Sequence, residues 1–119
     1  IKRGGGAIVA MSGMSNHVGT PNRAHVSASK AGLEGLMRSL AVEFGGQNIR
    51  ANCIAPGAID TVRGASAGVL PGTLTLAGTP LGRKGGVDEI AAMVRLLVGP
   101  EGAYVTGQTI HVNGGVFLT

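Results

Sequence analysis

Several side chains that could move a proton lie close together in one short stretch near the beginning of the chain. Ser12, Ser15 and His17 follow an apolar run, and His25 and Lys30 come a few residues later. Hydroxyl, imidazole and ammonium groups are the ones that general acid–base catalysis uses. The spacing of the three histidines matches no metal-ligand pattern, so the sequence predicts no metal site. Residues 12–30 are therefore the candidate site for proton transfer.

The same stretch resembles the active-site segment of the short-chain dehydrogenase/reductase family. In that family a serine follows a strand, and the motif Tyr-x-x-x-Lys lies on the next helix. Lys30 stands at the lysine position, whereas Val26 occupies the tyrosine position and Gly13 the serine position. The resemblance implies that the lysine is retained while the two side chains that handle the proton are missing.

Two later segments extend the resemblance over essentially the whole chain. Residues 48–61 are similar to the family's strand and Pro-Gly motif, and residues 106–115 look like its last strand and turn. No G-x-G-x-x-G motif is present, because the glycines at 4–6 precede a strand instead of following one. The resemblance implies that residues 1–119 are the C-terminal part of a single Rossmann-type domain, whose first half is absent from this chain.

The resemblance also implies a nicotinamide half-site, with NAD or NADP as the cofactor. Lys30 would hydrogen-bond the nicotinamide ribose, and the turn that begins at Pro56 and Gly57 would clamp the carboxamide. In that turn the backbone of Ile59 would contact the amide, with the Thr61 hydroxyl nearby. Two plainer interpretations stay open, namely a helix-start lysine with a solvent or backbone partner and a turn that only ends a strand.

Apolar runs and loop residues alternate along the chain. The alternation predicts an α/β fold with parallel strands, the C-terminal half of a Rossmann-like doubly wound sheet. We expect its first strand to need a neighbour that this chain does not contain, because parallel sheets protect their edges. The predicted elements are strands at 7–11, 49–55 and 109–112, helices at 26–44 and 87–98, a loop at 14–23 and a lid at 60–86.

The longer predicted helix carries an apolar face, and Gly45 with Gly46 is expected to end it in left-handed conformations. Glu34 and Arg38 fall outside this face and form a favourable pair four residues apart. Cys53 lies in a predicted strand and is expected to be a small buried hydrophobe. The apolar face consists of Leu33, Leu36, Met37, Leu40, Ala41 and Phe44.

Composition narrows the class of protein. The chain of 119 residues is 44% hydrophobic and 13% charged, which favours a globular domain over disorder. Its ten lysines and arginines are scattered and its net charge is +4, so we expect no nucleic-acid partner. Its apolar runs are too short to cross a bilayer, and its lone cysteine suits a reducing compartment, so we expect a cytoplasmic protein without a membrane partner.

Two main functional hypotheses follow. Because Val26 has no ionisable proton and Gly13 has no side chain, the first is a degenerate family member. It would be a non-catalytic subunit in a homo- or hetero-oligomer with active family members. The alternative is an NAD(P)-dependent ketone or alcohol oxidoreductase whose acid–base groups have moved to Ser15, His17 or His25. A stable fragment with a structural role is a third interpretation.

Overall fold

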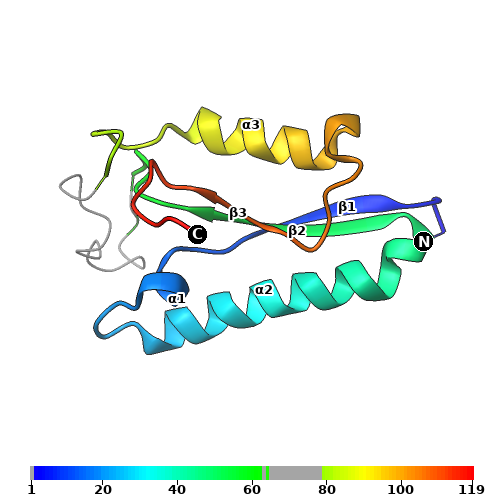
Figure 1. The fold of residues 1–119 in the computed structure, drawn as a ribbon, viewed down its shortest axis with the longest axis horizontal. Helices are drawn as coiled ribbons and strands as arrows, with labels where there is room; N and C mark the ends of the chain where they lie inside the picture. The colour runs from blue at the N-terminus through cyan, green and yellow to red at the C-terminus, as the bar shows by residue number, and fades with distance from the viewer. Residues whose placement is uncertain (1, 63, 65–78) are drawn as a thin grey trace.

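The computed structural model describes residues 2–62, 64 and 79–119. Its main elements are the strands β1 (Gly6–Met11), β2 (Ile49–Pro56) and β3 (Thr109–Val112) and the helices α2 (Ala24–Phe44) and α3 (Val87–Val98). The strands form one parallel sheet in the order β1-β2-β3. Helix α2 covers one face of this sheet and α3 the other (Figure 1). This three-layer arrangement confirms the predicted α/β, Rossmann-like architecture.

The middle strand β2 forms the centre of the core. Ala51 and Cys53 are completely buried and pack against Met37 and Ala41 of α2. Successive strand side chains point to opposite faces, so the equally buried Ile54 faces α3. Burial raises the pKa of the Cys53 thiol. Cys53 is thus the small buried hydrophobe that the sequence predicts.

Helix α2 ends at Phe44 as predicted, but the left-handed turn after it does not lie at the predicted glycines. Gly45 keeps a right-handed conformation and leads into the 3-10 helix η1 (Gly45–Gln47). The left-handed residue is Asn48, with φ 59°. Its side-chain Nδ2 donates to the carbonyl of Gly4 at 3.2 Å. The prediction that Gly45 and Gly46 end the helix in left-handed conformations was wrong, because asparagine tolerates this conformation and takes the turn.

The inward face of α2 also differs from the predicted one. Leu36 was placed on that face but is 51% exposed, whereas Glu34 was placed outside it and is only 4% exposed. Glu34 lies three residues before Met37 and seven before Ala41, so all three share one stripe of the helix. A carboxylate stays inside at this position because several hydrogen bonds compensate for its lost hydration.

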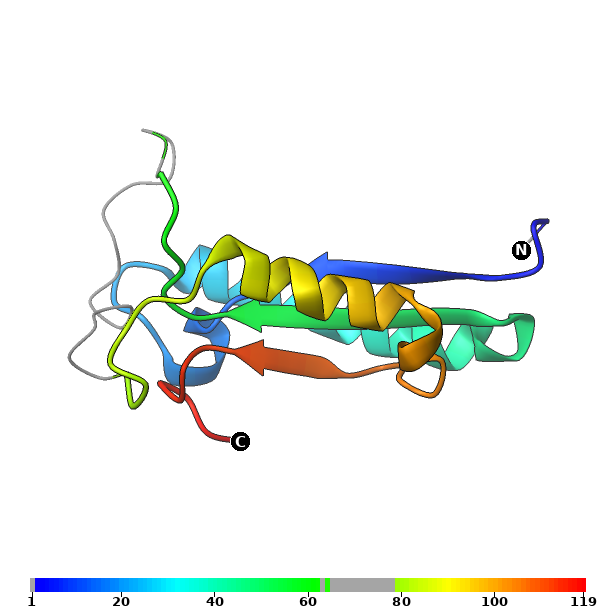
Figure 2. The same ribbon diagram turned by 90° about the horizontal axis from the view of Figure 1, so that it is seen from above.

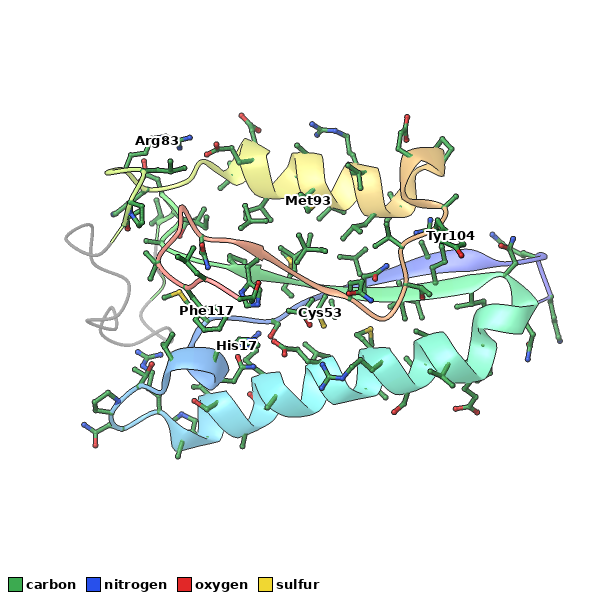
Figure 3. All side chains as sticks on the ribbon, viewed as in Figure 1. His17, Cys53, Arg83, Met93, Tyr104 and Phe117 are labelled. Carbon is green, nitrogen blue, oxygen red and sulfur yellow. The ribbon has the colours of Figure 1, made fainter. Side chains whose placement is uncertain are left out.

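A short helix, α1 (Ser15–Val18), interrupts the segment that was predicted as a loop. The Ser27 hydroxyl donates to the carbonyl of Ser15 at 3.2 Å and so ties α1 to the first turns of α2. In Figure 3, His17 lies between the sheet and α2. Helix α1 therefore places the imidazole of His17 between the sheet and α2.

Helix α3 begins and ends as predicted. It lies over the sheet and runs antiparallel to β2 (Figure 2). Met93 points from α3 towards the sheet (Figure 3). At the beginning of α3, the Glu89 carboxylate accepts a hydrogen bond from the Gly86 N–H at 2.7 Å and pairs with Arg83 at 2.8 Å. The predicted lid at 60–86 lies largely outside the described residues.

Candidate functional site

Lys30 and the two substituted positions lie close to the carboxyl end of β1. Lys30 Nζ donates to the carbonyl of Met11 at 2.7 Å, which is the backbone partner of the plainer interpretation. A Cβ built at Gly13 would meet only the Lys30 side chain, at 3.9 Å. Val26 precedes Lys30 by about one turn of α2. This part of the site thus holds an ammonium group without the phenol or hydroxyl of the family pattern.

One turn further along α2, the carboxylate of Glu34 collects three hydrogen bonds on a single oxygen. Its Oε1 accepts from the Ser12 hydroxyl, from Asn16 Nδ2 at 3.1 Å and from His17 Nε2 at 2.9 Å. Burial by itself would raise the pKa of Glu34, but hydrogen bonds from Ser12, His17 and Asn16 together lower it below its ordinary value. Glu34 is therefore ionised at neutral pH.

The ionised carboxylate decides which nitrogen of His17 carries a hydrogen. A carboxylate can only accept hydrogen bonds, so Nε2 of His17 is the donor to Glu34. The other nitrogen, Nδ1, is then an acceptor in the neutral imidazole and a donor in the imidazolium. A carboxylate that orients an imidazole in this way is the usual support of a histidine acid or base.

The ring of His17 also packs against two residues that line a cleft. Its centroid lies 4.6 Å from that of His111 and 5.3 Å from that of Phe117, and Figure 3 shows His17 and Phe117 on the same side of the sheet. The cleft has a volume of about 680 Å³ and lies at the carboxyl ends of β2 and β3. Burial and the neighbouring His17 lower the pKa of His111, which is therefore neutral at pH 7.

The Pro-Gly turn has the shape of a backbone clamp. A Cβ at Gly57 would lie 2.7 Å from the backbone of Asn113, so only glycine fits this close approach. Ile59 and Gly85 form an isolated parallel bridge. Its two hydrogen bonds join Gly85 to the C=O of Ala58 and to the N–H of Asp60, the residues on either side of Ile59. Its own N–H and C=O therefore face away from Gly85. These groups could contact an amide, as the resemblance implies.

The three candidates for a relocated acid or base, Ser15, His17 and His25, have different surroundings in the structure. His17 reaches the carboxylate of Glu34. His25 is exposed at the beginning of α2, and Ser15 uses its carbonyl to hold Ser27. Thr61, predicted near the carboxamide, is exposed at the border of the described residues.

Sequence reasoning missed Glu34 and His111 as members of the site. A signal for Glu34 was present, because it lies four residues after Lys30 and shares the stripe of Met37. No local signal pointed to His111, which reaches His17 only because β3 and α1 meet in space. Among the described residues, no group of three or more potential ligands could hold a metal ion. No helix among them is both long and apolar enough to span a membrane.

A parallel sheet between helices, with polar groups gathered at the carboxyl ends of its strands, defines a Rossmann-like α/β protein. The family model described as "Enoyl-(Acyl carrier protein) reductase" matches residues 1–117. A solved short-chain dehydrogenase/reductase from Brucella melitensis, titled glucose/ribitol dehydrogenase, is 33% identical with a TM-score of 0.80. The match covers 95% of this chain and 44% of the Brucella melitensis chain. The chain belongs to the short-chain dehydrogenase/reductase family.

Two curated relatives show how much of the family this chain represents. The 3-oxoacyl-[acyl-carrier-protein] reductase FabG of Vibrio cholerae is 37% identical over 118 residues, which are 99% of this chain and 48% of the relative. The peroxisomal 2,4-dienoyl-CoA reductase SPS19 of Saccharomyces cerevisiae is 40% identical over 119 residues, which are 98% of this chain and 41% of the relative. The chain thus spans less than half the length of these relatives.

Proposed function

We propose that this chain is the substrate-side part of an NAD(P)-dependent reductase that acts on an acyl thioester with a conjugated C=C bond. The observation that carries the proposal is the pairing of a retained Lys30 with Val26 and Gly13 at the positions of the proton-handling side chains. The fold is that of an oxidoreductase family. The reaction should therefore be one that needs a hydride but no phenol at the substrate oxygen.

The two reductions differ in the charge that they create. Adding a hydride to a ketone carbon leaves an alkoxide, a strong base that must be protonated beside its carbon. Adding a hydride to the far end of a C=C–C=O system leaves an enolate, whose charge is spread over the thioester carbonyl. Such a charge can be stabilised by hydrogen bonds, and the proton can be delivered later and elsewhere. A site without the phenol is suited to the second reaction.

The relatives and the cleft support an acyl thioester as the substrate class. Both relatives described above are named as reductases of acyl thioesters, one of a 3-oxoacyl group and the other of a 2,4-dienoyl group. In this chain the cleft has apolar walls from Ile59, Leu81 and Phe117. An aliphatic acyl chain would gain hydrophobic contacts there.

The residues present fit the nicotinamide end of NAD or NADP. The glycine-only approach at Gly57 and the outward-facing backbone groups of Ile59 suit a carboxamide, while the Lys30 ammonium suits a ribose hydroxyl. Pro56 ends β2 before this turn, and Thr61 would add a hydroxyl beside it. When bound, the nicotinamide supplies the hydride.

The test uses the full-length protein, purified without any partner, with NADPH or NADH. The probes are trans,trans-2,4-hexadienoyl-CoA, trans-2-hexenoyl-CoA and acetoacetyl-CoA, followed at 340 nm and by product mass. We expect cofactor oxidation with a conjugated C=C substrate and little with acetoacetyl-CoA. Turnover of acetoacetyl-CoA alone would instead support the ketone or alcohol oxidoreductase with relocated groups. No turnover of any probe would contradict both.

A non-catalytic subunit is the second candidate, and the same two substitutions support it. The exposed side of α2 carries Leu36 and Val42, which are 51% and 87% exposed. Such residues could pack against an active family member in a homo- or hetero-oligomer. Any turnover by the full-length protein alone refutes this candidate. The buried free thiol of Cys53 agrees with a reducing compartment such as the cytoplasm, which we propose as the location.

A further inference from the structure

We propose that His17, oriented by Glu34, is the proton donor of this site, so that its acid lies on α1 and not on α2. The inference rests on the proposed function and adds to it the group that completes the reduction. His17 would be a catalytic residue and Glu34 its positioning residue. The next observations give the proposal its geometry.

The imidazole of His17 is held from one side and open at the other. Its Nε2 is bound to Glu34, and the same Glu34 oxygen is fixed by Ser12, which immediately precedes Gly13. The His17 side chain is 22% exposed, so the ring can exchange protons with water. Its remaining nitrogen, Nδ1, is the one that can carry a transferable proton. The imidazole is thus tied, through the Glu34 carboxylate, to the residue that precedes the family's serine position.

Two residues next to His17 carry polar atoms without a hydrogen-bond partner. Among the described residues, Asn16 Oδ1 and His111 Nδ1 are buried without a hydrogen-bond partner. Buried polar atoms of this kind normally bind water or a ligand. Asn16 precedes His17, and the ring of His111 meets that of His17 edge-on at 4.6 Å. His111 also lines the cleft, so the ring of His17 lies next to a residue of the proposed substrate site.

The charges that face His17 are consistent with this role. Glu34 of α2 faces it as a carboxylate at 2.9 Å, and Lys30 lies one turn before Glu34. His111 of β3 faces it as a neutral ring, because burial and His17 lower the pKa of His111.

The proposed step balances as follows. When bound, NAD(P)H would supply the hydride for the new C–H bond at the far carbon of the conjugated system and would be oxidised to NAD(P)⁺. The π electrons move to the thioester carbonyl, which becomes an enolate. The Nδ1–H of the His17 imidazolium then breaks, and its proton forms the second C–H bond. Neutral His17 regains a proton from water through its exposed part.

The decisive experiment compares variants of the full-length protein on the thioester that the wild type reduces. His17→Gln keeps an N–H for Glu34 but cannot ionise. We expect its rate to fall by about 10²- to 10⁴-fold, the usual contribution of general acid catalysis. The wild-type rate should fall as pH rises through one ionisation, whereas the profile of His17→Gln should be flat. Imidazole added to His17→Ala should restore part of the rate.

A measurement on the unmodified protein provides a readout independent of activity. Nitrogen-15 NMR of labelled histidine should find neutral His17 with its hydrogen on Nε2, and Glu34→Gln should reduce that preference. His25→Gln is the matched control, since His25 is exposed on α2, and it should keep the wild-type rate and pH profile.

The outcomes separate the two proposals. Wild-type rate and wild-type pH dependence in His17→Gln would overturn the role of His17 and leave the proposed function intact. A hydrogen on Nδ1 of neutral His17 would also overturn it. No turnover by the wild type would refute the proposed function, and the proton donor with it.

Discussion

At the scale of single residues, Gly13 and Val26 are the positions at which the proposed function can be tested most directly. A Cβ at Gly13 would contact Lys30 at 3.9 Å, so a serine fits there without strain. We predict that Gly13→Ser with Val26→Tyr in the full-length protein raises acetoacetyl-CoA reduction by about 10²- to 10⁴-fold, because a hydroxyl and a phenol return beside the ammonium. Gly13→Ser with Val26→Phe is the control, and equal rates for the two double variants would contradict the prediction.

Replacing Glu34 should strongly reduce the stability of the fold. Glu34→Ala removes the acceptor of Ser12, Asn16 and His17. We expect it to lower the free energy of unfolding by about 3–5 kcal/mol, the usual cost of breaking a buried pair. Glu43→Ala, on the exposed side of the same helix, should change it by less than about 0.5 kcal/mol. Urea denaturation of the two variants measures the difference, and equal midpoints would contradict it.

The same residue should make stability depend on pH. The folded-state pKa of Glu34 lies below its ordinary value of 4.5, so the folded protein binds fewer protons there than the unfolded chain. Its contribution is fully present above that value and is lost as the pH falls through the lowered pKa. The difference in free energy of unfolding between the wild type and Glu34→Ala should therefore become smaller below pH 4.5.

At the scale of elements, the turn after β2 depends on one close approach. We predict that Gly57→Ala lowers the free energy of unfolding by about 1–3 kcal/mol, because the new methyl group would meet the backbone of Asn113 at 2.7 Å. The same change should weaken cofactor binding in a fluorescence titration. Gly32→Ala on α2 is the control, since its Cβ meets nothing within 4 Å and alanine favours a helix. Similar losses in both variants would argue against the clamp.

The beginning of α3 offers a second test at this scale. Hydrogen bonds from Arg83 and from the Gly86 N–H lower the pKa of Glu89 to about 2. A lowered pKa stabilises the fold above the unfolded value of 4.5, and the effect is lost as the pH falls towards 2. We expect Glu89→Gln to lower the melting temperature at pH 7. Near pH 2 the variant and the wild type should have the same melting temperature. Asp88→Asn is the control. A difference in melting temperature between Glu89→Gln and the wild type that persists at pH 2 would contradict this account.

At the scale of the whole molecule, β1 is one of the two edges of the described sheet. The N–H groups of Gly6 and Ser12 bond to β2, so by alternation those of Ala7, Val9 and Met11 face outward. We predict that in the full-length protein these outward groups pair with a further strand. Their hydrogen exchange, measured by NMR, should be as slow as that of Ala10. Fast exchange at all three would show an open edge.

Much of this fold could be predicted because apolar periodicity is local information. The bounds of α3 and β3 were correct, and those of β2 were correct to one residue, since Pro-Gly and Gly-Pro pairs mark the ends of β2 and α3. The end of α2 at Phe44 was also correct, but its left-handed turn was assigned to the wrong residues, because glycine and asparagine can both take this turn and only packing chooses between them. The exposure of Leu36 depends in the same way on which stripe of α2 meets the sheet.

The sequence by itself determined the family, the parallel α/β order and the loss of the phenol and hydroxyl at Val26 and Gly13. These are properties of residue type and spacing along one chain. The tertiary structure decided that Glu34 is inside and that His17, not Ser15 or His25, is oriented by a carboxylate. Those facts depend on side chains from β1, α1, α2 and β3 meeting in space. A buried charge is stable only where such partners converge, and no local pattern records that convergence.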